Sequence, residues 1–367
     1  MNDQVRYRVV VLIVSFHNPD DVCACLTALS RATVQPSFDV FICENGGSES
    51  FNKLCMALAG PQGPCTTISD DLPKSTISPS GRMVDVRCLA LKGRSSRLWI
   101  GCAAQNLGYA GGINVWIERL LQFTDWEGIW ILNPDSEPEP GALYELVDRA
   151  VAGRKGMVGS TILEFGDRNQ VHCRGGHRWR MLMTKLTIIG SREPANGPVD
   201  VQKIEAALDS ISGASMYVTR ACLEKIGPMD ERFFLYAEDA DWSIRAKRCG
   251  LGYASGSLVP HRGGTTIGHT QSRTNRSRLS VYLESRNRIL FGRKHLRRIL
   301  LPLATILGFL YTIEYLLAGS PQNFKTALDG LVAGLKGETG QPSNLHNEAL
   351  ARPMPEVGQA GRGPSSP

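Results

Sequence analysis

The sequence predicts an α/β fold in which a mixed, largely parallel sheet is flanked by helices and followed by a C-terminal helical extension. Arg8–Ser15 is an apolar, β-branched run typical of a strand buried on both faces. Asp20–Arg31 then has apolar residues at helical spacing, and Asp39–Cys43 is a second strand that ends at a Gly-rich turn. A strand, a helix and a strand in this order predict a βαβ unit with parallel strands.

The remaining elements follow from the same patterns. Apolar runs predict strands at Gly128–Leu132, Met157–Leu163 and Ala214–Val218, and we expect ordered structure to resume near Val84–Leu91. Helical spacing predicts helices at Ile113–Phe123, Gly141–Val151, Arg220–Ile226 and Asp239–Cys249. We therefore expect one α/β domain over residues 1–290 with a surface insertion near 59–82, basic and apolar helices over 291–340, and an unstructured tail over 341–367.

Composition narrows the class of protein. With 42% hydrophobic and 21% charged residues, the chain of 367 residues can bury a core, which excludes wholesale disorder. The net charge of +6 is local, because residues 262–298 contain ten Lys and Arg residues and one acid, Glu284. Such a basic belt suits phosphates or an anionic membrane surface better than nucleic acid, which we do not expect as a partner.

The ten cysteines are scattered without the paired spacing of a zinc site. We interpret them as reduced residues of a cytosolic protein, and we expect no signal segment at the N-terminus.

Ile299–Leu317 approaches the length of a membrane-spanning helix but carries Glu314 and Pro302. It also follows a basic cluster at 293–298. Three interpretations stay open: docking at the inner membrane surface, packing onto the α/β domain or a second subunit, and true spanning.

Two acidic clusters lie at positions where the active sites of α/β folds are usually found. Asn133-Pro134-Asp135 directly follows the strand Gly128–Leu132, so its carboxylate would reach the cleft beyond the sheet and could hold Mg²⁺ or Mn²⁺. Ordinary turn chemistry also accounts for this tripeptide. Glu238, Asp239 and Asp241 open a predicted helix, where acids are favoured, but their aromatic neighbours would raise a carboxylate pKa toward that of a general base.

Two further segments could contact a nucleotide. Asn106–Asn114 is a Gly-rich turn that leads into a helix, and its backbone N–H groups would suit a phosphate or a ribose. It is neither a dinucleotide-binding fingerprint nor a P-loop. His261 follows a short apolar strand, where it could contact a metal or phosphate or be structural.

In this order and spacing, the clusters resemble the family 2 glycosyltransferases, and among them the rhamnosyltransferase-like branch that works on bacterial surface polysaccharides. The resemblance covers roughly residues 7–340, with a longer region than usual at 59–98. Its matching stretches are Ser15–Asn18, Glu44–Gly46, Asn106–Asn114, Leu132–Pro138, Ser212–Met216, Gly227–Trp242, His261 and Tyr282–Asn287. Two positions depart from the family pattern: residue 44 is Glu in place of Asp, and Asp135 is one carboxylate where many relatives have two.

The resemblance implies a GT-A fold, with a Rossmann-like nucleotide-binding sheet, and inverting, metal-dependent sugar transfer from a nucleotide diphosphate. It implies that Asp239 is the general base, that Glu238 and Asp241 shape its field, and that Asp135 binds Mg²⁺ or Mn²⁺ with His261 as a further ligand. The implied nucleotide-sugar contacts are Ser15, Asn18, Glu44 at the base, Asn106, Gly108, Gly112, Asn133 and, at the diphosphate, Arg286.

The implied partners are a dTDP- or UDP-sugar, with rhamnose as the first guess, and a glycan or lipid-linked acceptor in cell-wall or surface polysaccharide synthesis. We expect a peripheral protein at the inner face of the cell membrane, with residues 299–335 as the surface for any homo-oligomer.

Three other functions compete with this one. A sugar nucleotidyltransferase would carry a Gly-rich, basic loop after the first strand, where this chain reads Ser15-Phe16-His17-Asn18-Pro19. A non-catalytic nucleotide-sugar-binding partner would not need both Asp135 and Asp239. An NAD enzyme would carry the dinucleotide-binding fingerprint.

Overall fold

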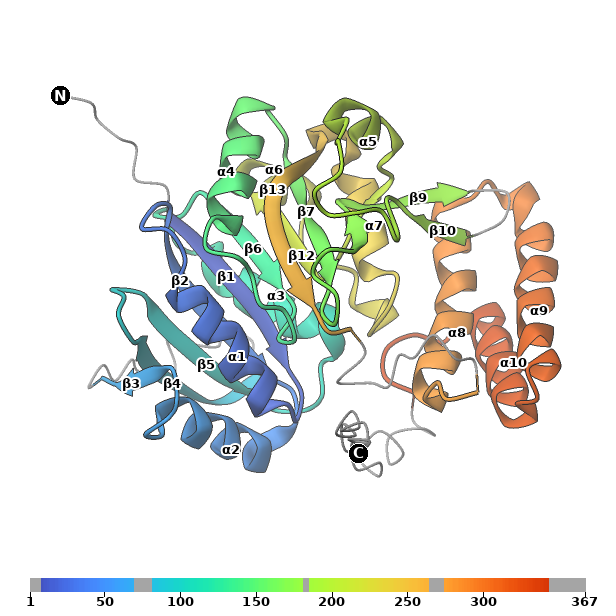
Figure 1. Ribbon diagram of the computed structural model, residues 1–367. Helices are drawn as coiled ribbons and strands as arrows, with labels where there is room; N and C mark the ends of the chain where they lie inside the picture. Colours follow the sequence, from blue (N-terminus) through green and yellow to red (C-terminus); the bar gives the residue numbers. More distant parts are fainter. Residues whose placement is uncertain (1–7, 69–80, 181–184, 264–273, 343–367) are drawn as a thin grey trace, which may run out of the picture.

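The computed structural model describes residues 8–68, 81–180, 185–263 and 274–342 (Figure 1). It contains a ten-stranded mixed sheet, a small three-stranded sheet, and helices that flank the larger sheet. The predicted α/β class, the mixed sheet and the C-terminal helical extension are confirmed. The tail at 343–367 and residues 69–80 of the predicted insertion lie outside the described residues.

The strands are β1 (Arg8–Ser15), β2 (Ser37–Glu44), β3 (Cys65–Thr67), β4 (Met83–Leu91), β5 (Arg97–Ala103), β6 (Gly128–Leu132), β7 (Met157–Glu164), β8 (Val171–Arg174), β9 (Gly176–Arg180), β10 (Lys185–Ile188), β11 (Ser210–Ile211), β12 (Ser215–Thr219) and β13 (Leu251–His261). The larger sheet has the order β13-β7-β12-β6-β1-β2-β5-β4-β3, with β8 paired to β7. The smaller sheet has the order β10-β9-β11.

The helices are α1 (Pro19–Ser30), α2 (Gly47–Ala59), α3 (Gly108–Leu120), α4 (Ala142–Ala152), α5 (Val201–Ala207), α6 (Arg220–Ile226), α7 (Glu238–Ala246), α8 (Arg278–His295), α9 (Leu301–Leu317) and α10 (Pro321–Lys336). Short 3₁₀ turns are η3 (Glu231–Phe233), η4 (Lys247–Cys249) and η5 (Arg298–Leu300).

Two hydrophobic cores lie on the two faces of the larger sheet. One contains Leu26 of α1, Phe51 of α2 and Leu146 of α4, packed against alternate residues of β1 and β2. The other contains Trp116 of α3 and Trp242 of α7, packed against the intervening residues of β1. Both faces are therefore covered, which explains why the central strands read as continuous apolar runs.

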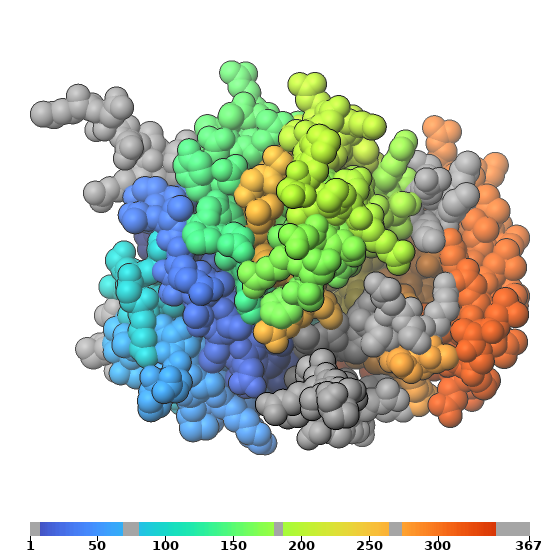
Figure 2. All heavy atoms as spheres, viewed as in Figure 1, coloured from blue at the N-terminus to red at the C-terminus, as the bar shows by residue number. Residues whose placement is uncertain are grey.

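The three C-terminal helices pack on one another and form one side of the molecule, drawn in orange to red in Figure 2. α8 runs without interruption through residue 290, where we placed a domain boundary from sequence. All ten cysteines are free thiols, as expected.

Candidate active site

The site residues predicted from sequence come mainly from loops at one edge of the larger sheet. β1, β2, β5, β6, β7 and β13 point in the same direction, so all of them end at this carboxyl edge. β12 is antiparallel to β6 and therefore begins there. Ligands of open α/β sheets bind beyond this edge.

The ends of β1 and β2 are fastened together through Glu44, which is buried. Its Oε2 lies 2.5 Å from Ser15 Oγ, and its Oε1 accepts a 2.8 Å hydrogen bond from the Gly46 N–H. Asn18 joins the group because its Oδ1 lies 3.1 Å from the same Ser15 hydroxyl. The structure thus brings Ser15, Asn18 and Glu44 together, with both Glu44 oxygens engaged by neighbouring loops.

The Gly-rich turn before α3 is attached to this group through Asn45. Asn45 Nδ2 donates to the Gly108 carbonyl at 2.9 Å, and Asn106 Oδ1 accepts from the Gly108 N–H at 3.0 Å. A Cβ on Gly112 would lie 2.9 Å from both Val14 methyl groups, so glycine allows α3 to approach the end of β1. Asn106, Gly108 and Gly112 therefore lie beside the Ser15–Glu44 group.

Asp135 and His261 meet at the end of β6 although 126 positions separate them along the chain. Asp135 Oδ1 lies 3.0 Å from His261 Nε2, and Asn133 Nδ2 lies 3.2 Å from the same nitrogen. Backbone hydrogen bonds hold the turn, because Arg262 N–H donates to the Asp135 carbonyl at 3.1 Å. A carboxylate is a suitable ligand for Mg²⁺ or Mn²⁺, and an imidazole can join it on a transition-metal ion such as Mn²⁺. No group of three or more His, Cys, Asp and Glu side chains suited to a metal occurs in the described parts of the chain.

Tyr109 connects this pair to α7, and we did not select it from sequence. Its hydroxyl lies 3.0 Å from both Asn133 Oδ1 and the Gly213 carbonyl oxygen. Burial raises the pKa of Tyr109 well above its ordinary value, and the charges of Glu238, Asp239 and Asp135 add to the effect. The sequence feature that could have pointed to Tyr109 is its position inside the Gly-rich turn N-L-G-Y-A-G-G.

Glu238 and Asp239 begin α7 on the other side of Gly213. Asp239 Oδ2 accepts from the Gly213 N–H at 3.3 Å, and its Oδ1 accepts from the Ala240 N–H at 2.7 Å. Glu238 is only 4% exposed, and burial together with the neighbouring Asp239 charge raises its pKa to about 8. Glu238 therefore keeps its proton at neutral pH.

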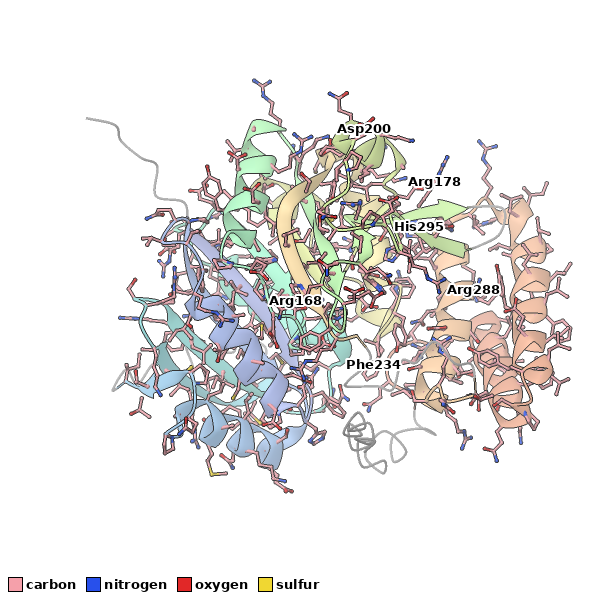
Figure 3. All side chains as sticks on the ribbon, in the orientation of Figure 1. Arg168, Arg178, Asp200, Phe234, Arg288 and His295 are labelled. Carbon is pink, nitrogen blue, oxygen red and sulfur yellow. The ribbon has the colours of Figure 1, made fainter. Side chains whose placement is uncertain are left out.

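The segment before Glu238 has an unusual backbone. Phe234, Tyr236 and Ala237 have φ values of 66°, 69° and 73°, a region that residues other than glycine rarely adopt. Asn287 of α8 stabilises this segment, because its Nδ2 lies 2.8–2.9 Å from the carbonyl oxygens of Phe233, Leu235 and Tyr236. Figure 3 shows Phe234 between the central sheet and α8. Backbone strain of this kind concentrates at functional sites.

Asp241 lies apart from the other two acids of the cluster. Its buried carboxylate contacts Lys294 Nζ at 2.6 Å, His295 Nε2 at 2.8 Å and Arg245 Nε at 3.0 Å. Burial alone would raise the pKa of Asp241, but the hydrogen bonds from His295 and Lys294 outweigh burial and lower it. The contacts of Asp241 join α7 to α8.

Arg286 is not brought to the carboxyl edge either. Its side chain is 1% exposed and donates to the carbonyl oxygens of Phe233 and Gly340 and to Asn287 Oδ1. The contact with Phe233 supports the segment before α7, and the three contacts together engage every nitrogen of the guanidinium group.

Three buried polar atoms beside the site have no hydrogen-bond partner among the described residues: Ser136 Oγ, His177 Nδ1 and Glu238 Oε2. Ser136 follows Asp135, and His177 on β9 feels the charge of Asp239. Burial lowers the pKa of His177, so the ring is neutral near pH 7. We missed His177 from sequence because it stands on a short strand without a recognisable motif.

No protein-family model matches the chain. It is 25% identical over 248 residues to the low-salt glycan biosynthesis hexosyltransferase Agl10 of Haloferax volcanii, which covers 65% of this chain and 76% of that protein. It is 27% identical over 163 residues to the N-acetylglucosaminyl-diphospho-decaprenol L-rhamnosyltransferase of Mycobacterium tuberculosis, over 40% of this chain and 52% of that protein.

Among solved structures, the mannosyltransferase PcManGT from Pyrobaculum calidifontis, in complex with GDP-Man and Mn²⁺, aligns with a TM-score of 0.46 and 12% identity. That alignment covers 95% of this chain and 80% of the mannosyltransferase. By sequence, the chain is therefore similar to named glycosyltransferases of glycan assembly.

Proposed function

We propose that the chain is an inverting glycosyltransferase of the GT-A type, of family 2 and its rhamnosyltransferase-like branch. It transfers a sugar from a nucleotide diphosphate to a hydroxyl group of a glycan or lipid-linked acceptor. The observation that carries the proposal is the set of contacts from Asp135 and His261, through Asn133, Tyr109 and Gly213, to Asp239. In this set, the candidate site for the leaving group and the candidate base lie at the same edge of the sheet.

In the proposed reaction the acceptor oxygen attacks the anomeric carbon while the bond from that carbon to the diphosphate oxygen breaks. Asp239 takes the proton of the attacking hydroxyl, and the nucleoside diphosphate leaves with the bonding electron pair. One displacement inverts the anomeric centre, so one base and no covalent nucleophile is sufficient. Asp239 fits this role because its carboxylate is fixed by two backbone N–H groups, one of Gly213 before β12 and one of Ala240 in α7.

Asp135 and His261 would hold Mg²⁺ or Mn²⁺, which would supply positive charge that stabilises the leaving diphosphate. Ser15, Asn18, Glu44, Asn106, Gly108 and Gly112 lie at the ends of β1, β2 and β5, where the nucleoside would bind. Arg286 and Asp241 would act by holding the segment around α7.

The donor class is a dTDP- or UDP-sugar, with rhamnose as the first candidate. The hexosyl- and rhamnosyltransferase names of the two relatives support transfer of a sugar in glycan assembly. A sugar acceptor would also supply partners for Glu238 Oε2 and His177 Nδ1, whose burial without a hydrogen bond costs about 1–3 kcal/mol each.

The test measures release of nucleoside diphosphate from a panel of nucleotide sugars with Mg²⁺ or Mn²⁺, with and without lipid-linked glycan. We expect release from one donor and a loss of about 10²-fold or more in Asp239→Asn, which keeps the shape but not the base. Asp148→Asn, an exposed aspartate on α4, is the matched control and should retain turnover. Donor binding without release under any condition would identify a non-catalytic binding partner, and release of pyrophosphate from a sugar phosphate and a nucleoside triphosphate would identify a nucleotidyltransferase.

A further inference from the structure

The inner face of α9 is fixed to the rest of the molecule. Ala304, Gly308, Thr312 and Tyr315 are its buried residues, and a Cβ on Gly308 would lie 2.8 Å from Leu331 of α10. Arg276 Nη1 donates to the Tyr315 hydroxyl at 3.1 Å. α9 is therefore one member of a packed three-helix unit with α8 and α10.

A cation–π contact adds to this attachment. The Arg288 guanidinium of α8 lies 4.2 Å from the centre of the Tyr311 ring on α9. Figure 3 shows Arg288 projecting from α8 beside α9. A separation of the two helices would break the contacts of both Tyr311 and Tyr315 and expose the apolar side of α10.

The outer face of α9 is apolar along its whole length. Its exposed large side chains recur at helical spacing and are Leu303, Ile306, Phe309, Leu310, Leu316 and Leu317. Ile306 is 57% exposed and Leu317 82% exposed. A continuous apolar surface of this size on a folded chain marks an interaction site.

Positive charge adjoins this face at its start. Arg297 and Arg298 are exposed and directly precede Ile299, which is 83% exposed. On the neighbouring α10, Lys325 is exposed near its start and Lys336 is exposed at its end, where it lies 4.0 Å from Glu338. A basic cluster beside an apolar helical face is complementary to an anionic lipid surface, where each basic residue contributes about 1 kcal/mol.

Arg298–Leu317 is long and apolar enough to cross a membrane by length and composition, and 22% of its most apolar stretch is buried. We infer that α9 instead lies in the plane of an anionic bilayer, with Ile306 and Leu310 in the boundary between head groups and acyl chains and Arg297 and Arg298 among the phosphates. The fixed inner face supports this orientation, because spanning would require α9 to leave α8 and α10.

Docking in this way would hold the candidate active site at the membrane surface. α8 carries Asn287, which holds the segment before Glu238, so the docked unit and that segment are directly connected. A membrane-held site suits a lipid-linked acceptor. The docking inference rests on the surface of α9 and does not depend on the proposed reaction.

The test is co-sedimentation of the full chain with phosphatidylcholine vesicles, with or without phosphatidylglycerol. We expect binding to the mixed vesicles, little binding to phosphatidylcholine alone, and release by salt. The double change Ile306→Asp with Leu310→Asp should abolish binding. Met56→Asp on α2, where the methionine is 67% exposed, should leave binding unchanged.

A second variant tests the charge contribution separately. Arg297→Gln with Arg298→Gln should weaken binding to the mixed vesicles by about 30-fold, from about 1 kcal/mol per basic residue. Retained binding in the apolar double variant would overturn the inference. Resistance of the bound protein to extraction with alkaline carbonate would also overturn the inference, because it indicates a spanning helix. A protein that does not bind vesicles but forms a dimer that Ile306→Asp dissociates would overturn it as well. Circular dichroism detects loss of folding, and sugar-nucleotide turnover detects loss of the proposed activity. Both can therefore be distinguished from loss of docking.

Discussion

Adjacent side chains of this protein have different environments, and Glu238 and Asp239 are the sharpest case. Glu238 is buried, and its Oε2 has no hydrogen-bond partner within the described structure, whereas Asp239 accepts backbone hydrogen bonds from Gly213 and Ala240. A neutral Glu238 can donate a hydrogen bond to a bound molecule beside Asp239, the proposed base.

Glu238→Gln tests this protonation through stability. The pKa of about 8 in the folded state exceeds the ordinary value of 4.5, so between these pH values the folded chain holds a proton that the unfolded chain has lost. The free energy of unfolding therefore falls as pH rises from about 4.5 to 8. We expect the free energy of unfolding of the Gln variant to match that of the parent near pH 4.5 and to exceed it by about 4 kcal/mol at pH 8, since each pKa unit is worth about 1.4 kcal/mol.

Urea unfolding at a series of pH values measures this difference. Glu127→Gln, at an exposed glutamate, is the control and should show no pH-dependent gap. A gap of the same size at pH 4.5 and pH 8 for Glu238→Gln would mean that the carboxyl group is ionised in the folded chain.

Asp135→Ala tests the candidate metal ligand. We expect Mn²⁺-dependent nucleotide binding to weaken by about tenfold or more, because the carboxylate oxygen nearest to His261 is lost. Titration calorimetry with nucleoside diphosphate, with and without Mn²⁺, measures the effect. Unchanged Mn²⁺ dependence would exclude Asp135 as a ligand, and Asp148→Ala controls for the loss of one negative charge.

At the scale of elements, loops rather than helices and strands bring the site together, and close backbone approaches fix the loops. Tyr109 N–H donates to the Phe234 carbonyl at 2.8 Å, which joins the start of α3 to the segment before α7. Gly108 makes this approach possible. Its φ is +70°, and a Cβ would lie 2.2 Å from the Phe234 carbonyl oxygen.

Gly108→Ala should therefore displace the segment that positions Asp239. We expect a loss of about 1–2 kcal/mol from the left-handed backbone alone, more from the steric contact, and a fall in turnover of about tenfold or more. Gly141→Ala is the matched control, because this glycine has a negative φ and a Cβ there would meet no atom within 4 Å. Equal stability and turnover in the two variants would show that the approach is not required.

At the scale of the whole molecule, the C-terminal helices support the α/β domain as well as extend it. Asn287 and Arg286 of α8 hold the carbonyl oxygens before α7, and Asp241 of α7 pairs with Lys294 and His295 near the end of α8. The two parts of the chain therefore share the segment that carries the candidate base.

Asp241→Ala should show how much this junction contributes. The change removes the carboxylate shared by Lys294, His295 and Arg245, of which Lys294 retains its 2.7 Å contact with Asp230. Because the other two lose their buried negative partner, we expect the free energy of unfolding to fall by about 3–5 kcal/mol. Chemical denaturation measures the effect, with Asp329→Ala at an exposed position on α10 as the control. A change below about 1 kcal/mol would mean that the junction does not stabilise the fold. At permissive temperature, kcat should fall more than donor affinity, because α7 carries Asp239.

Much of the fold follows from local pattern. The runs Arg8–Ser15 and Gly128–Leu132 coincide with β1 and β6, because strands buried on both faces must be apolar throughout. α2 and α8 were not predicted. α8 contains many basic residues, and the residues that it buries include Arg286 and Asn287, so its sequence lacks a clear apolar stripe.

The sequence by itself determined the α/β class, the central strands, and the positions of Asp135, Asp239 and the Gly-rich turn, because strand ends and turns have strong local signatures. Only the tertiary structure decided which of these residues meet. Asp239 and Asp241 are two positions apart on a helix that turns about 100° per residue, so they face opposite sides, one toward Gly213 and the other toward α8. Tyr109, His177 and the inward direction of Arg286 likewise depend on contacts between segments distant in sequence, which no local pattern encodes.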